Sequence, residues 1–172
     1  GGMGNDSYIV DNVGDVVTEA IGEGYDRLYT SVDYTLAAGT EVELLIALGG
    51  SGVTFTGNEF GNQLVGNELA NTLYGLGGAD YVRGGLGSDT LYGGDAADLI
   101  DGEGGSDAMS GGTDNDTYLL DDAGDTVSEA VGEGYDTVYS YVNFTIAAGQ
   151  EIELVVLLDG QGALSATGNE FG

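Results

Sequence analysis

The chain lacks five residue types altogether: cysteine, histidine, lysine, proline and tryptophan. Without cysteine it has no disulfides and no thiolate metal ligands, and without histidine it has neither a Ser–His–Asp triad nor a histidine-ligated zinc hydrolase. The absence of lysine also excludes Ser–Lys catalysis. No run of about eighteen apolar residues occurs, so the sequence predicts no membrane-spanning helix. We therefore expect no catalytic residues and no enzyme.

Basic side chains are almost as scarce. Arg27 and Arg83 are the only cationic residues against 30 Asp and Glu, which gives a formal net charge of −28. Such a chain is not expected to bind nucleic acid or an anionic membrane through its charge. A hydrophobic fraction of 41% and eleven tyrosines argue against disorder. Acidity alone also fits solubility or adaptation to salt, so the position of the acidic residues decides between these explanations.

The sequence does contain a repeat of nine residues. Residues 75–119 divide into GLGGADYVR, GGLGSDTLY, GGDAADLID, GEGGSDAMS and GGTDNDTYL. Position one is always Gly, at 75, 84, 93, 102 and 111, and position six is always Asp, at 80, 89, 98, 107 and 116. Position eight is apolar or aromatic: Val82, Leu91, Ile100, Met109 and Tyr118. Three columns that keep a nine-residue period are typical of a β-helix-type coil.

Each column of the repeat has a physical meaning. Glycines at positions one, two and four allow tight turns with positive φ, and the last three residues form a short strand whose middle side chain points inward. Two nonapeptides make one coil, so residues eighteen apart stack at about 4.8 Å. Carboxylates at that spacing repel each other by roughly 1 kcal/mol per pair in water, and by about 3 kcal/mol at an effective dielectric of 20. A divalent cation between coils reverses this repulsion, and oxygen-only ligands favour a hard ion such as calcium.

The pattern Gly-Gly-x-Gly-x-Asp-x-apolar-x resembles the repeats-in-toxin (RTX), or haemolysin-type, calcium-binding repeat, and GGLGSDTLY at 84–92 matches it at every position. The resemblance implies an all-β fold, a right-handed parallel β-roll (a β-helix or solenoid) with calcium-binding turns. It also implies several bound Ca²⁺ ions and secretion by a type I route. Paired carboxylates also occur in glycosidases, but their regular register favours a ladder of ligands over a catalytic pair.

In this family each ion lies between two turns that are one coil apart. One turn supplies the carbonyls of positions two and four and its Asp, and the next supplies the carbonyls of positions one and three and its Asp. The resemblance therefore implies four ligand sets: Leu76, Gly78 and Asp80 with Gly93, Asp95 and Asp98; Gly85, Gly87 and Asp89 with Gly102, Gly104 and Asp107; Gly94, Ala96 and Asp98 with Gly111, Thr113 and Asp116; Glu103, Gly105 and Asp107 with Leu120, Asp122 and Asp125. Ala96 replaces the usual Gly and weakens the third set.

A longer period encloses the short one. Residues 1–61 recur as 111–172, so the unit is about 110 residues long, with one unit at 1–110 and part of a second at 111–172. We expect one continuous solenoid over 1–172, a fragment of a longer array, with the strongest calcium-binding turns in 75–128. The position-six column extends to Asp6, Asp15 and Asp26 in the first copy and to Asp116, Asp125 and Asp136 in the second. The second copy leaves open a further ion between Asp116 and Asp136, with Asp6 and Asp26 as its counterpart in the first copy. Glu19 and Glu129, at a two-residue insertion, are either ligands there or, as we prefer, exposed edge carboxylates.

The remaining segments predict coils without metal. Residues 31–36 and 141–146 alternate as half-buried strands, and residues 41–48 and 151–158 are interpreted as buried strands, with the core column passing through Ile46 and Phe55. In residues 57–74 position six is Asn62 or Asn71, and position four is Phe60 or Leu69. We expect hydrogen bonds of stacked asparagines there instead of calcium.

The leading interpretation is a calcium-binding structural module of a secreted bacterial surface, adhesive or surface-layer-type protein that folds on calcium binding outside the cell. One alternative is an accessory module, carbohydrate-binding or stabilising, of a secreted polysaccharide-modifying enzyme. Its sugar-binding strip would consist of Tyr25, Tyr29, Tyr34, Tyr135, Tyr139 and Tyr141, although two arginines are a poor basis for binding an anionic glycan. A self-assembling filament subunit, with coils stacked end to end, is the other alternative.

Overall fold

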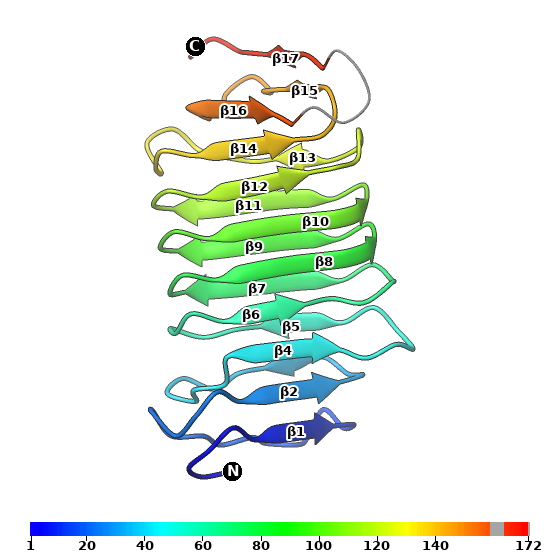
Figure 1. Cartoon of the computed structure of the whole chain (residues 1–172), viewed down its shortest axis with the longest axis vertical. Coiled ribbons are helices and arrows are strands. Elements are labelled where there is room, and N and C mark those ends of the chain that lie inside the picture. Colours follow the sequence, from blue (N-terminus) through cyan, green and yellow to red (C-terminus); the bar gives the residue numbers. More distant parts are fainter. Residues whose placement is uncertain (159–163, 172) are drawn as a thin grey trace.

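The computed structural model describes residues 1–158 and 164–171. These residues form a solenoid of parallel strands in which one sheet lies behind the other (Figure 1). None of the described residues forms a helix of the length and apolarity needed to cross a membrane. The expected all-β parallel β-roll is confirmed.

The larger sheet has nine strands, one from each coil. Its order is β1-β2-β4-β6-β8-β10-β12-β14-β16, and every pairing is parallel. The strands are β1 (Ser7–Val10), β2 (Arg27–Thr30), β4 (Leu44–Ala47), β6 (Gln63–Val65), β8 (Tyr81–Gly87), β10 (Leu99–Gly105), β12 (Thr117–Leu120), β14 (Thr137–Ser140) and β16 (Leu154–Leu157). The chain leaves this sheet after each strand and returns to it one coil later.

The opposite side of the solenoid is made by the intervening strands. A six-stranded sheet has the order β13-β11-β9-β7-β5-β3, and a further pair joins β15 to β17. The strands are β3 (Tyr34–Thr35), β5 (Thr54–Thr56), β7 (Thr72–Gly77), β9 (Thr90–Asp95), β11 (Ala108–Thr113), β13 (Thr126–Val127), β15 (Phe144–Thr145) and β17 (Ala166–Thr167). Strands β7 to β11 are the longest because the glycine-rich residues that follow each apolar triplet extend the pairing.

The core is a single column of side chains between the two sheets. Val82 pairs with Ile100 and Leu73 pairs with Leu91, each one coil of eighteen residues apart. The side chains at these four positions are fully buried. The predicted coil of two nonapeptides, with position eight as the core position, is therefore confirmed for residues 75–118.

Outside the regular repeat the coils change length. Leu28 pairs with Leu45, seventeen residues on, so Leu45 and not Ile46 enters the core. The prediction of Ile46 was wrong because it assumed an unshifted period, whereas Phe55 is fully buried as expected. Ser7 pairs with Arg27 at a spacing of twenty residues, which confirms the predicted two-residue insertion.

The strands of these longer coils are shorter than predicted. The alternating residues 31–36 and 141–146 contain only the two-residue strands β3 and β15. The apolar run 41–48 contains β4, in which alternate residues are buried. In β16 none of the four residues is fully buried, so the prediction of a buried strand there was wrong.

Candidate metal centre

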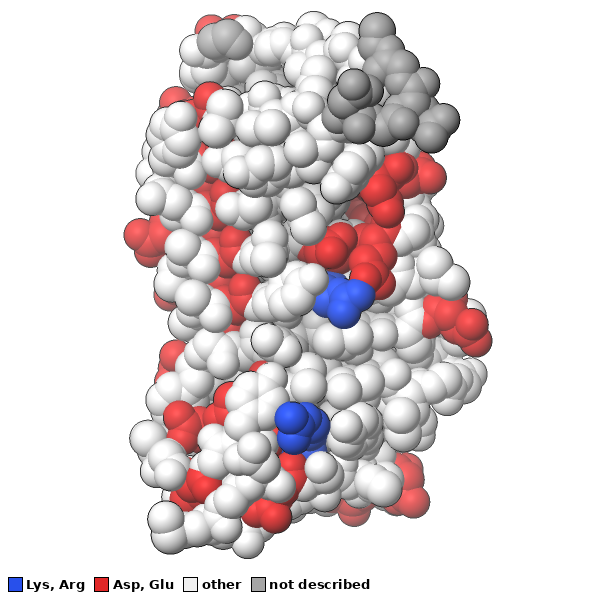
Figure 2. Space-filling view, viewed as in Figure 1, with Lys and Arg blue, Asp and Glu red and all other residues white. Residues whose placement is uncertain are grey.

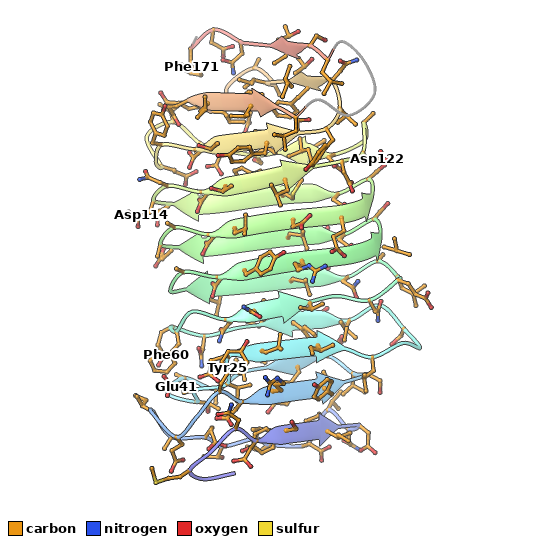
Figure 3. The ribbon with its side chains drawn as sticks, in the orientation of Figure 1. Tyr25, Glu41, Phe60, Asp114, Asp122 and Phe171 are labelled. Atoms are coloured by element: carbon orange, nitrogen blue, oxygen red, sulfur yellow. The ribbon has the colours of Figure 1, made fainter. Side chains whose placement is uncertain are left out.

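Two columns of aspartates line the two edges of the solenoid. Each position-six Asp directly precedes a strand, so the strand pairing fixes its height along the axis. One edge carries Asp80, Asp98, Asp116 and Asp136, and the other carries Asp89, Asp107 and Asp125. Figure 3 shows Asp114 and Asp122, which belong to turns of the two columns, on opposite edges. All seven aspartates of the columns are buried, although carboxylates are seldom buried without a partner.

One oxygen of each carboxylate is held by the backbone of the coil before it. The N–H of Asp80 donates to Oδ1 of Asp98 at 2.7 Å, and the N–H of Asp98 donates to Oδ1 of Asp116 at 2.8 Å. On the other edge the N–H of Asp89 donates to Oδ1 of Asp107 at 2.8 Å. Because the same bond recurs on each coil, each carboxylate has a fixed orientation, with its other oxygen directed into the turn.

That second oxygen has no hydrogen-bond donor. Among the residues that the structure describes, the Oδ2 atoms of five successive aspartates are buried and unpartnered: Asp80, Asp89, Asp98, Asp107 and Asp116. A buried anionic oxygen without a partner carries a large desolvation cost. Five in register indicate a missing positive partner and not an isolated defect.

The turn glycines leave room beside these oxygens. A Cβ atom on Gly84 would collide with Asp89 Oδ2 and would lie 2.8 Å from the carbonyl oxygen of Gly102, one coil further on. On the opposite edge a Cβ on Gly75 would collide with Asp80 Oδ2 and lie 2.5 Å from the carbonyl oxygen of Gly93. The space in front of Gly75 and Gly84 is thus bounded by a carboxylate and a carbonyl of the same implied ligand set.

The turns keep one backbone conformation whether or not glycine is present. Positions two and four have positive φ in all five nonapeptides, including the non-glycine residues Leu76 (80°), Ala96 (82°), Glu103 (54°) and Asp114 (75°). The left-handed conformation costs an L-residue roughly 1–2 kcal/mol. Ala96, the residue expected to weaken its set, therefore holds the same turn under strain.

Burial makes the charged form of these carboxylates unfavourable. Burial, with a smaller contribution from neighbouring carboxylates, raises the pKa of Asp80, Asp107 and Asp116 to about 7 and that of Asp98 to about 6. Figure 2 shows acidic side chains along both margins of one face, with the two basic side chains nearer its middle. Arg83, which pairs with Glu103, is the only basic side chain of the described residues in an ion pair, so no basic side chain compensates the aspartate columns.

The asparagine turns differ from the aspartate turns in detail. In the described chain neither position two (Asn58, Asn67) nor position four (Phe60, Leu69) has positive φ. Instead Asn58 Nδ2 donates to the carbonyls of Ala37 at 3.1 Å and Thr40 at 2.7 Å.

Asn67 Nδ2 likewise donates to the carbonyls of Leu48 at 3.1 Å and Ser51 at 2.7 Å. In both turns a side-chain amide bridges two carbonyls of the coil before it. The sequence reasoning named Asn62 and Asn71 but missed these position-two amides, although the recurring Gly-Asn-Glu could have indicated them.

Several implied ligands lie on the surface of the turns. Asp95, Thr113 and Asp122 have exposed side chains, as expected if only their carbonyls bind the ion, and Thr113 Oγ1 donates to Asp95 Oδ1 at 3.3 Å.

Asp125 is the last aspartate of its column, and neither of its oxygens is unpartnered, because both accept backbone N–H groups. Asp15 is exposed and accepts from the N–H of Asn12, and the structure does not bring it together with the aspartate columns.

The widened coils gather two further groups of carboxylates. Asp6, Glu19 and Asp26 form one group and Asp116, Glu129 and Asp136 the other, and within each group the ligand atoms lie within 4.8 Å of one another. Glu19 is 3% exposed and Glu129 is 2% exposed. The preferred interpretation of these two residues as exposed carboxylates was therefore wrong. Each side chain turns inward and accepts a backbone N–H from seventeen or eighteen residues earlier, that of Gly2 for Glu19 and that of Gly111 for Glu129.

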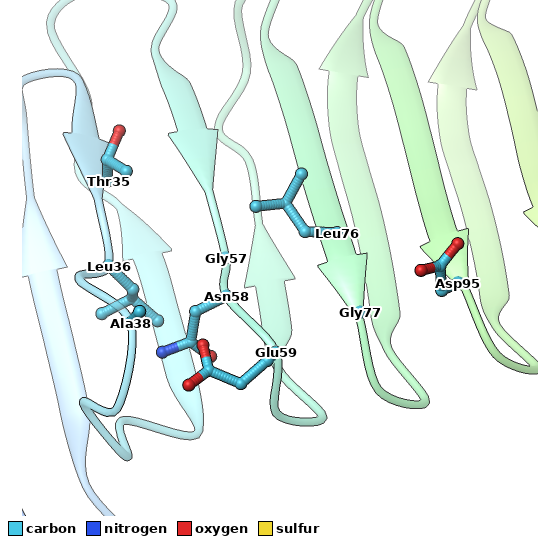
Figure 4. A pocket seen from close by; sticks show the side chains of 9 residues that line it. All are labelled: Thr35, Leu36, Ala38, Gly57, Asn58, Glu59, Leu76, Gly77 and Asp95. Carbon is cyan, nitrogen blue, oxygen red and sulfur yellow. The ribbon is translucent and has the colours of Figure 1, made fainter.

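A shallow apolar depression of about 460 Å³ borders the turns of the first implied ligand set, to which Leu76 and Asp95 belong. Its lining residues include Thr35, Leu36, Asn58, Glu59, Leu76 and Asp95 (Figure 4).

The strip of tyrosines named for the carbohydrate-binding alternative is not formed as a whole, because Tyr34 is 8% exposed and its hydroxyl accepts the N–H of Val17 at 3.0 Å. Tyr135 and Tyr141 are each more than half exposed.

The asparagine and aspartate turns also match a known protein family. The family described as RTX calcium-binding nonapeptide repeat (4 copies) matches residues 56–91 and 84–118. A comparison with curated proteins gave no match. The matched residues run from β5 to β12 and include both the asparagine turns and the aspartate turns, which differ in their position-six residue and in their backbone geometry. Residues 56–118 therefore match the RTX calcium-binding nonapeptide repeat, and they are wound as a β-roll.

Proposed function

We propose that the chain is a calcium-dependent structural module, in which ions between successive turns hold the β-roll together. The four ligand sets are those implied by the repeat, and the first two have the strongest support. In these sets the unpartnered oxygens of Asp80 and Asp89 each face a carbonyl of the next coil. The column of buried, unpartnered Oδ2 atoms is the single observation that carries the proposal.

Calcium suits this donor set. Carboxylate and carbonyl oxygens are hard ligands, and the described chain offers them at both edges without any nitrogen or sulfur side-chain ligand. Each ion between coils replaces repulsion of neighbouring carboxylates with attraction to a shared dication. Because the sites form only when coils stack, the free energy of binding contributes to folding.

The location of the parent protein follows from this coupling. Affinities of about 10⁻⁴ to 10⁻³ M are typical of extracellular calcium modules. At the low calcium concentration inside a cell the carboxylates would keep the chain unfolded, and at extracellular concentrations the β-roll would form. We propose a secreted or cell-surface protein, and the 110-residue unit favours a large surface or adhesive protein in which several such units follow one another.

The decisive experiment is a calcium titration of the whole chain followed by far-ultraviolet circular dichroism, with a magnesium titration as the control. We expect little β-structure without calcium, a cooperative gain at millimolar calcium and little response to magnesium, which keeps its waters and demands stricter octahedral geometry. A chain that is fully folded without calcium, or that folds equally well with magnesium, would contradict the proposal.

A further inference from the structure

The widened coil of the second copy holds a buried glutamate that the nonapeptide pattern does not account for. Thr117 pairs with Thr137 at a spacing of twenty residues. Between them the chain forms β13 and then places Glu129 inward, 2% exposed. Such a side chain is seldom buried unless something pairs with it.

The backbone orients all three carboxylates of this group. Glu129 Oε1 accepts the N–H of Gly111 at 3.1 Å, Asp116 Oδ1 accepts the N–H of Asp98 at 2.8 Å, and Asp136 Oδ1 accepts the N–H of Asp116 at 2.8 Å. The other oxygens of Glu129 and Asp116 are buried and unpartnered. The three side chains thus use one oxygen for orientation and bring acidic oxygens within 4.8 Å of one another.

A tyrosine hydroxyl lines the same space. Tyr118 occupies the core column, where the four preceding nonapeptides carry Val, Leu, Ile and Met. A Cβ atom on Gly111 would collide with both Asp116 Oδ2 and the Tyr118 hydroxyl, so these two oxygens flank one small volume. Tyr118 is fully buried, and its hydroxyl accepts the N–H of Gly111.

The first copy repeats the combination. Tyr8, Glu19 and Asp26 stand where the second copy has Tyr118, Glu129 and Asp136. There Glu19 is likewise buried, at 3% exposed, and the ligand atoms of Asp6, Glu19 and Asp26 lie within 4.8 Å of one another.

We propose that Asp116, Glu129 and Asp136, with the Tyr118 hydroxyl, form a calcium site of a second type. This site shares Asp116 with the third nonapeptide set but is otherwise distinct from the sites between nonapeptide turns. Three carboxylates meet one ion here, against two in each nonapeptide set. Calcium affinity rises with the number of charged ligands and with the rigidity of the site. The widened coil therefore binds calcium more tightly than the ladder does and fills first. Its defining ligand is Glu129, which belongs to none of the nonapeptide sets.

The test compares Glu129→Gln with Glu68→Gln in the whole chain. Both remove one charge, and Glu68 is exposed and lies in an asparagine turn. Binding of calcium alone is measured by isothermal titration, with circular dichroism following the fold. We expect Glu129→Gln to remove one ion from the tightest class, or to weaken its affinity at least tenfold, and Glu68→Gln to leave the isotherm unchanged.

The outcomes separate this site from the ladder. If aspartate substitutions in the ladder have no effect and Glu129→Gln still loses an ion, this site stands while the proposed function fails. If Glu129→Gln binds calcium as the parent chain does, the site is overturned. Should the variant fold poorly, a metal site predicts that higher calcium restores the fold, and a variant that stays unfolded at every calcium concentration overturns the site as well.

Discussion

The backbone N–H of Asp89 donates to Oδ1 of Asp107 at 2.8 Å, one coil away, while Oδ2 of each residue stays buried and unpartnered. One oxygen of each carboxylate thus accepts a backbone hydrogen bond, and the other is available to bind an ion. The bond from backbone to carboxylate sets the height and rotation of each carboxylate, so stacking of the coils orients the ligands toward the ion. This division of the carboxylate leads to separate predictions for its two oxygens and for the glycine beside it.

Replacing both Asp89 and Asp107 with Ala should remove bound calcium and raise the calcium midpoint of folding at least tenfold, because one edge loses its charged ligands. Isothermal titration counts the ions and circular dichroism gives the midpoint. The matched control is Asn62 and Asn71 to Ala, which shortens two buried side chains at the same column position. The control should shift the midpoint less and leave the number of ions unchanged. Equal ion loss in both pairs would refute the division into metal and metal-free turns.

The calcium-free chain should be more stable at pH 5 than at pH 8. The pKa values of Asp80, Asp107 and Asp116 in the fold, about 7, lie above the ordinary 3.8, so the folded state binds protons more tightly than the unfolded state. The resulting stabilisation is fully present below pH 3.8 and is lost as the pH rises through 7. Far-ultraviolet circular dichroism in chelator at several pH values measures this trend as the fraction of β-structure, which should increase from pH 8 to pH 5. A flat profile would show that these carboxylates are not buried in the calcium-free state.

Calcium affinity should change with pH in the opposite sense. A proton and a calcium ion compete for the same oxygens, so the calcium midpoint should fall as the pH rises from 6 to 8. Repeating the dichroism titration across that range measures the shift. A midpoint independent of pH would indicate that the carboxylates with raised pKa do not bind the ion.

Gly84→Ala should destabilise the calcium-bound fold by about 1–3 kcal/mol, the usual cost of overpacking. The new Cβ would collide with Asp89 Oδ2 and approach the carbonyl of Gly102 to 2.8 Å. Gly77→Ala is the control, because a Cβ there meets nothing closer than 3.6 Å and its φ is not positive. Urea unfolding in saturating calcium gives both values. Equal losses would mean that the space beside Gly84 has no special role.

Ala96→Gly should stabilise the β-roll by up to about 1 kcal/mol. Its φ of 82° strains an L-residue by roughly 1–2 kcal/mol, and the added flexibility of glycine in the unfolded chain offsets part of that gain. Ala108→Gly, at an exposed position of β11, should instead destabilise the fold, since φ there is not positive. If both substitutions destabilise the chain equally, the turn at Ala96 is not strained in solution.

Asn58→Ala should cost about 1–3 kcal/mol in saturating calcium, because the carbonyls of Ala37 and Thr40 lose their shared donor. Asn67→Ala removes an equivalent bridge in a more exposed turn and should cost less. The number of bound ions should not change in either variant. Loss of an ion on replacing Asn58 would show that the amide does not substitute for a cation there.

The regular part of the molecule could be predicted from local sequence alone. Val82, Ile100 and Tyr118 recur at one phase of an eighteen-residue period, and a parallel coil is the arrangement that buries all three in one column. The same period places Asp80 above Asp98 without any knowledge of distant contacts. Glycine at position one follows as well, since any side chain there would collide with the carboxylate of its own turn.

Other features depend on how distant coils close, and only the tertiary structure decided them. The coil from Leu28 to Leu45 has seventeen residues and the next has nineteen. The lengths differ because pairing with the neighbouring strands, and not a fixed number of residues, determines where each coil closes. Glu129 looked exposed in sequence, but in the fold it is buried beside Asp136 and accepts the N–H of Gly111 from the coil before it. The sequence by itself thus determined the ladder, whose spacing is local, whereas long-range stacking decided the amide bridges and the third carboxylate.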